Sequence, residues 1–157
     1  MKRLFLSALL AVLFASTAKA GFDDGLAAYE EGDYVAALRE WRPLADEGDL
    51  DAQFYLGEMH LRGKGVDRDF KKASEWLAKA AQAGHPRAQG VLGGLYAVGL
   101  GVPQDFGRAY FWMIVAAIWS DAEIRQQAMN SLGEVAEQLS PEEKQAIAKQ
   151  AVPQWRR

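Results

Sequence analysis

The sequence predicts an all-α protein, a superhelix of antiparallel helix pairs closed by C-terminal capping helices. An internal repeat is the main reason, because residues 52–81 and 88–117 align without a gap at an offset of 36 residues. Within each copy the apolar residues recur at helical spacing. Two capping-box patterns after residue 119 indicate further helix starts beyond the repeat.

The first element, residues 1–20, has the pattern of a cleaved signal peptide. Lys2 and Arg3 precede the apolar run LFLSALLAVLF, and an A-x-A cleavage site ends at Ala20. The apolar run is too short for a stable membrane span. We therefore expect cleavage before Gly21 and a periplasmic or secreted protein without a stable membrane anchor.

Charge and cysteine content narrow the possible partners. Without residues 1–20 the chain has fifteen Lys and Arg residues against twenty-one Asp and Glu residues, a net charge near −6. Such an acidic chain has no general attraction for nucleic acid or anionic lipid. The chain has no cysteine, which excludes disulfides, thiolate metal sites, thiol catalysis and a lipid-modified N-terminal cysteine.

Residues 21–48 are expected to form the first helix pair. Five of them lie 36 positions before identical or similar residues of the next copy: Asp33, Tyr34, Ala37, Ala45 and Gly48. The glycine-rich loop of the later copies is absent here, and YEEGDY stands in its place. Trp41 is one position out of phase with Trp76, and Pro43 predicts a kink because proline removes a backbone donor.

Residues 49–84 and 85–119 are expected to form two full helix pairs. Asp69 is a favourable N-cap for the second helix of the first of these pairs. Gly57 and its counterpart Gly93 lie inside helices, where glycine is less stable than alanine by about 1 kcal/mol. We expect these glycines to allow close approach of the partner helix.

The stretch GKGVDRDFKKA, from Gly63, looks like a phosphate-binding loop because glycines flank Lys64 before a helix. The equivalent stretch from Gly99, GLGVPQDFGRA, has leucine in place of the lysine, and neither copy has P-loop spacing. We interpret both as helix-connecting loops, in which the first glycine ends a helix and Val66 and Val102 point inward.

The repeated pattern A-x-x-x-L-G-x-x-[YH]-x-x-G-x-G-V-x-x-D-F-x-x-A-x-x-W-x-x-x-A-A resembles the Sel-one-like repeat (SLR), a relative of the tetratricopeptide repeat. The resemblance is strong over residues 52–117 and weaker over residues 25–48, which look like a tetratricopeptide-like first unit. It implies a right-handed superhelix that holds other proteins. His60 departs from the pattern, which has an aromatic residue such as Tyr96 at that position.

Residues 120–157 depart from the repeat and are expected to form two capping helices. The stretches SDAE from Ser120 and SPEE from Ser140 match a capping box, the second with Pro141 at the first helical position. A stacked array needs such a terminal element with one polar face to cover its last core.

No catalytic set is found in the sequence. His60 and His85 lie on different elements, and both are interpreted as structural residues. No metalloprotease or serine-hydrolase motif occurs, and no calcium-loop pattern appears among the acidic residues. We expect no cofactor or metal. Some cysteine-rich relatives of the repeat are linked to β-lactam binding, a property that this cysteine-free chain is not expected to share.

The resemblance implies a binding surface on the concave side, which the first helices of the pairs line. It assigns the following partner-facing residues: Phe22 and Tyr29 in the first unit, Phe54, Glu58 and Arg62 in the middle unit, and Arg87 in the next. Gly90 and Gly94 would make the last part of this surface shallow. Trp119 and Trp155 are further interface candidates if they are exposed.

These observations predict a monomeric, non-catalytic adaptor of the cell envelope that binds a peptide or helix of a partner protein on its concave face. An envelope hydrolase or cell-wall-modifying enzyme is the alternative from another class, and it would use His60 with a nearby carboxylate. A secreted effector that binds a host protein shares the adaptor's mechanism and differs only in the location of its partner.

Overall fold

The computed structural model describes residues 21–154, so the predicted signal peptide and Trp155 lie outside the described residues. All regular structure in this range is helical. After a helix at residues 21–31 come α2 (Tyr34–Asp46), α3 (Leu50–Arg62), α4 (Phe70–Gln82), α5 (Pro86–Val98), α6 (Phe106–Trp119), α7 (Ala122–Ala136) and α8 (Pro141–Gln154). None of the helices in residues 21–154 is both long and apolar enough to cross a membrane.

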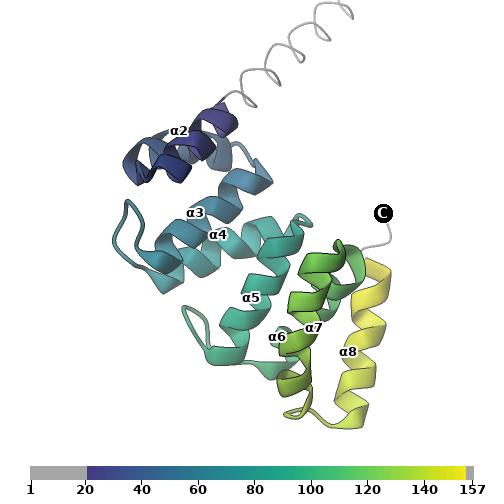
Figure 1. Cartoon of the computed structure of the whole chain (residues 1–157). Coiled ribbons are helices and arrows are strands. Elements are labelled where there is room, and N and C mark those ends of the chain that lie inside the picture. Colours follow the sequence, from purple (N-terminus) through teal and green to yellow (C-terminus); the bar gives the residue numbers. More distant parts are fainter. Residues whose placement is uncertain (1–20, 155–157) are drawn as a thin grey trace, which may run out of the picture.

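The helices stack in chain order as a superhelix, which confirms the predicted fold class (Figure 1). The closest packing joins α3 to α4 and α5 to α6, the two helices of each pair. Successive pairs touch through α2 against α3 and α4 against α5. Pro43 lies inside α2, and the kink expected there stays a prediction.

Side-chain N-caps start the helices at 36-residue intervals. The second helices of the pairs begin after Asp33, Asp69 and Asp105. The first helices of successive pairs begin after Asp49, His85 and Asp121. Each of these side chains accepts a hydrogen bond from the backbone N–H three residues later, which satisfies a donor that the helix itself leaves free.

The spacing of the N-cap residues shows that α7 continues the 36-residue register of the repeat, in addition to its expected role as a capping helix. A recurring hydrogen bond supports this register, because a side chain on each first helix donates to a carbonyl in the last turn of the preceding helix. The three equivalent bonds are Gln53 Nε2 to Ala45 O at 3.0 Å, Gln89 Nε2 to Ala81 O at 3.2 Å and Arg125 Nε to Ala117 O at 3.0 Å. By position and by bonding, α7 is thus the first helix of one more unit.

The two predicted capping boxes have different outcomes. At α7 the prediction was wrong in its cap residue: Asp121 caps the helix, and Ser120 belongs to the end of α6. At α8 the box is confirmed, since the Ser140 N–H donates to Glu143 Oε2 at 2.8 Å and the Glu143 N–H donates to Ser140 Oγ at 3.2 Å. The Ser140 N–H also holds the pKa of Glu143 below its ordinary value.

Glycine at the crossing of the two helices in a pair allows the close approach that the sequence predicted. A β-carbon on Gly57 would lie 2.6 Å from Cγ of Leu77, and one on Gly93 would lie 3.0 Å from Cγ of Met113. In the first unit a β-carbon on Gly25 would overlap the indole of Trp41.

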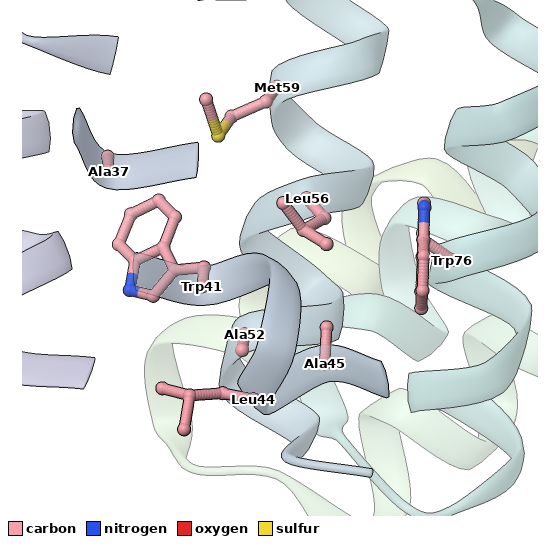
Figure 2. Packing of buried hydrophobic residues seen from close by; sticks show 8 residues of the cluster. All are labelled: Ala37, Trp41, Leu44, Ala45, Ala52, Leu56, Met59 and Trp76. Carbon is pink, nitrogen blue, oxygen red and sulfur yellow. The ribbon is translucent and has the colours of Figure 1, made fainter. Parts of the chain in front are cut away.

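These contacts correct the interpretation of Trp41 as a displaced counterpart of Trp76. Trp41 lies 36 residues before Leu77 and occupies the same place, opposite the glycine of its pair. It is fully buried among α2 and α3 residues, with Leu56 and Met59 nearby, while Trp76 reaches the same cluster from α4 (Figure 2).

The glycine loops dock each unit onto the one before it, as helix-connecting loops should. Gly63 and Gly99 have φ values of 68° and 74° and end α3 and α5. Gly101 also has a positive φ, and a β-carbon there would overlap the carbonyl oxygen of Phe70 at the start of α4. The loop thus covers the N-terminus of the preceding unit's second helix.

Lys64, the residue that suggested phosphate binding, faces the first unit. Its Nζ donates a hydrogen bond to the hydroxyl of Tyr29 at 3.0 Å. It also lies 4.6 Å from the centre of the Tyr29 ring and 4.8 Å from that of Tyr34. These contacts raise the pKa of Lys64 and make it a link between units.

After α7 the short connection 137–140 replaces the glycine loop, and α8 packs on α6. Ile147 of α8 comes within 3.7 Å of the position of a β-carbon on Gly107, near the start of α6. At this place in the earlier units the glycine loop covers the helix start. The last helix therefore covers the end of the array.

Candidate functional site

A groove of about 440 Å³ crosses the first helices of three successive units. Helix α5 runs along its floor, α3 forms one wall and α7 forms the other. Met113 of α6 contributes at the base. The groove exists because these three helices follow the same 36-residue register and so present equivalent faces to the same side.

Four of the six predicted partner-facing residues meet in this groove: Phe54, Glu58, Arg62 and Arg87. The other two, Phe22 and Tyr29, are not among the residues that line it. Their rings pack against Trp41 with centroid distances of 5.9 Å and 5.5 Å, in the aromatic cluster of the first unit.

The α3 wall is largely fixed by contacts within the protein. Phe54 is only 6% exposed, and its ring stacks on the imidazole of His85 with centroids 4.8 Å apart. The guanidinium of Arg87 lies 5.1 Å from the same ring. Arg62 Nε and Glu58 Oε2 form an ion pair at 2.7 Å. Phe54 therefore shapes the wall, while Arg62 and Arg87 present charge to the groove.

The α7 wall was missed by the sequence interpretation, which treated this helix only as a cap. Glu123, Ile124, Gln127 and Ser131 of α7 line the groove. The signal that predicts them is the N-cap spacing, because Asp121 lies 36 residues after His85. Glu123 thereby takes the place on α7 that Arg87 has on α5.

His85 forms an oriented pair with Asp51, but both of its ring nitrogens are occupied. Nδ1 accepts a hydrogen bond from the Ala88 N–H at 3.1 Å, and Nε2 lies 3.0 Å from Asp51 Oδ1. Nε2 must therefore carry the proton. Burial lowers the pKa of His85, and the bond to Asp51 opposes this shift only in part. The imidazole acts as a helix cap and has no lone pair free to act as a base.

His60 lies in a separate pocket of about 320 Å³, together with Asp46 and Glu75. Its Nδ1 is buried and has no hydrogen-bond partner within residues 21–154. Burial lowers the pKa of His60, and a hydrogen bond with the backbone of Asp67 opposes this shift only in part. The predicted enzyme alternative required a hydrogen bond between His60 and a carboxylate, and this nitrogen does not make one.

Two further features bear on the type of site. Trp119 at the end of α6 is 43% exposed, so the condition for treating it as an interface candidate is met. Within the part of the chain that the structure describes, no group of three or more acidic or histidine residues could hold a metal ion.

Residues 50–85 and 86–118 each match the Sel1 repeat. A Sel1 repeat protein from Oxalobacter formigenes is 31% identical, with a TM-score of 0.65, over 80% of this chain and 97% of that chain. A protective antigen of uropathogenic Escherichia coli strains, which displays an SLR fold, is 29% identical with a TM-score of 0.77 over 85% of this chain. The match covers 29% of the antigen, so this chain spans less than a third of its length. A search of curated protein sequences gives no match.

Proposed function

This chain belongs to the Sel1 repeat family, and from this premise we propose that it is an adaptor that holds a segment of a partner protein in the groove between α3, α5 and α7. Sel1 repeat proteins generally mediate protein–protein interactions and are generally non-enzymatic scaffolds. The proposal adds the surface that does the binding.

The groove itself is the observation that supports this proposal. Residues from three units, far apart in sequence, line one concavity that combines apolar side chains with charged residues at its rim. Val91 and Ile124 offer partly exposed apolar surface, whereas Arg87 and Glu123 offer opposite charges. A surface with an apolar centre and a polar rim is the usual anatomy of a protein-binding site.

We further propose that binding takes place outside the cytoplasm, in the periplasm or after secretion. The support is the sequence of residues 1–20 alone, with its basic start and apolar run. N-terminal sequencing of the protein recovered from its native compartment tests this part, and a chain that begins at Gly21 is the expected result. A chain recovered from the cytoplasm with Met1 in place would contradict it.

Crosslinking in cells that express the tagged protein, followed by mass spectrometry, tests the groove. Arg87→Ala/Gln127→Ala removes one exposed side chain from the floor helix and one from the α7 wall. Phe54 is unsuitable for this test because it is almost fully buried and its loss would disturb the core. Arg39→Ala/Gln145→Ala is the matched control, with exposed residues of the same types on α2 and α8.

A partner that crosslinks to wild type and to the control, but not to the groove variant, is the expected outcome. If every crosslinked partner is retained by the groove variant, binding occurs on another face and the proposal is wrong.

A further inference from the structure

From the floor of the groove we infer the kind of segment that it holds: an α-helix of the partner, with small residues against α5 and a carboxylate beside Arg87. The inference rests on the proposed function, because it describes the occupant of the same groove. Three features carry it, namely the glycines of the floor, the helical nature of the walls and the distribution of charge.

Gly90 and Gly94 lie four residues apart on α5 and line the groove floor. Packing within the protein does not require glycine at either place. A β-carbon on Gly94 would meet no atom within 4 Å, and one on Gly90 would only touch the Ala116 side chain at 3.9 Å. Neither residue has a positive φ. They differ in this respect from Gly57 and Gly93, whose missing side chains make room for the partner helix of the pair.

Glycine is a poor helix former, so these two residues weaken α5 without any benefit to internal packing. What they provide is an exposed strip of helix backbone at the base of the groove. Because residues at i and i+4 share one face of a helix, the strip extends over a full turn. Another backbone can approach such a strip more closely than it can approach any other residue type.

The walls and floor favour a helical occupant over an extended one. The backbone N–H and C=O groups of α3, α5 and α7 are bonded within those helices, so they offer no ladder to an added strand. An extended segment would therefore lose water from its backbone and find few partners in return. A helix satisfies its own backbone groups and can place an apolar stripe against Val91 and Ile124.

The charges at the rim specify the flanks of that helix. Arg62 is paired with Glu58, whereas Arg87 makes no ion pair within residues 21–154 and lies over the ring of Phe54. A guanidinium held in this way is suited to a carboxylate on an incoming helix. Glu123, at the equivalent position on α7, is exposed and favours a basic residue on the opposite flank. The occupant is thus acidic towards α3 and basic towards α7.

A display library of alanine-based helical peptides, with the residues of one face and both flanks randomised, tests the inference on the purified protein. A second library of proline-containing peptides, which cannot form a continuous helix, is screened beside it. Enriched helical peptides should carry Gly, Ala or Ser at two face positions four residues apart, and Asp or Glu on one flank. Circular dichroism of one enriched peptide with the protein measures whether it binds as a helix.

Three substitutions then locate the peptide. Gly94→Ala should raise the melting temperature by a few degrees and yet weaken binding at least tenfold, a combination that a purely structural glycine would not give. Gly133→Ala on α7 is the matched control: its added β-carbon also meets nothing within 4 Å, but Gly133 does not line the groove, so binding should be unchanged. Arg87→Glu should weaken binding at least tenfold, and a peptide with Lys in place of its acidic residue should restore most of the loss.

Several outcomes would overturn the inference. Enrichment from the proline library alone, or a Gly94→Ala variant that binds as wild type does, means that the occupant is not a closely packed helix. If Arg87→Glu still weakens binding in that case, the proposed function stands without the inference. If no groove substitution affects binding, both fail. A dimer of the protein that Gly94→Ala abolishes would make a second copy the occupant and would rule out the partner helix.

Discussion

Replacing Gly57 with alanine measures how closely α3 and α4 approach each other. The new β-carbon would lie 2.6 Å from Cγ of Leu77 and 3.3 Å from the carbonyl oxygen of Ala73. Leu77 is fully buried, and its Cγ is a branch point close to the backbone. The side chain therefore has no free end that can move aside, and relief requires the two helices to separate or Leu77 to leave its rotamer.

The magnitude follows from two opposing effects. Overpacking of this kind costs about 1–3 kcal/mol. Alanine is a better helix former than glycine by about 1 kcal/mol, which offsets part of the loss. We expect Gly57→Ala to lower the free energy of unfolding by about 0–2 kcal/mol, which corresponds to a drop in melting temperature of up to roughly 10 °C for a domain of this size.

Thermal and urea unfolding followed by circular dichroism provide the measurement. Gly133→Ala is again the reference, because its β-carbon enters open space and the helix should gain about 0.5–1 kcal/mol. Gly93→Ala should lie between the two, since its nearest neighbour is the flexible side chain of Met113 at 3.0 Å. If Gly57→Ala stabilises the protein as much as Gly133→Ala does, the close approach of α3 and α4 is wrong.

Three further outcomes are expected. Burial lowers the pKa of His60 and of His85, so the unfolded chain binds protons at a higher pH than the folded protein does. The melting temperature should therefore be highest above about pH 6.5 and decline below that pH. The decline should be shallower in the His85→Asp variant. A flat profile would contradict the neutral, buried state of both imidazoles. Lys64→Leu, which introduces the residue of the next repeat, should lower the urea midpoint because the contacts with Tyr29 are lost, and an unchanged midpoint would mean that this link adds nothing. Gln89→Leu removes the donor to Ala81 O, but this carbonyl still accepts the Gly84 N–H at 3.1 Å, so urea unfolding should show a loss of only about 0.5–1.5 kcal/mol.

The sequence predicted the parts of the fold that depend on local signals. Asp69 starts a helix, and Gly63 and Gly99 end one, because each acts through bonds or dihedral angles within a few residues. The repeat added the next level, since two copies of one pattern must form the same hairpin. The resemblance to the Sel-one-like repeat placed Phe54 and Arg87 on one surface, and both line the groove.

Local sequence patterns did not predict the packing of residues that contact more than one neighbouring helix. Helix α3 is buried against α2 on one side and α4 on the other, so its apolar residues do not form a single stripe. Trp41 was compared with Trp76 because the two residues are of the same type, although the 36-residue offset pairs it with Leu77, and the glycine opposite it confirms that equivalence. Phe22 and Tyr29 pack in the first unit's aromatic cluster for a related reason: that unit lacks the glycine loop, so its first helix has a different offset.

By itself, then, the sequence determined the helices and their pairing, because caps, turns and repeats act over short distances along the chain. Only the tertiary structure decided that α7 completes the groove, that Gly90 and Gly94 have room for a β-carbon and that Arg87 makes no ion pair within residues 21–154. Those properties depend on which side chains from other units reach the same space, and this is set by the stacking of the units.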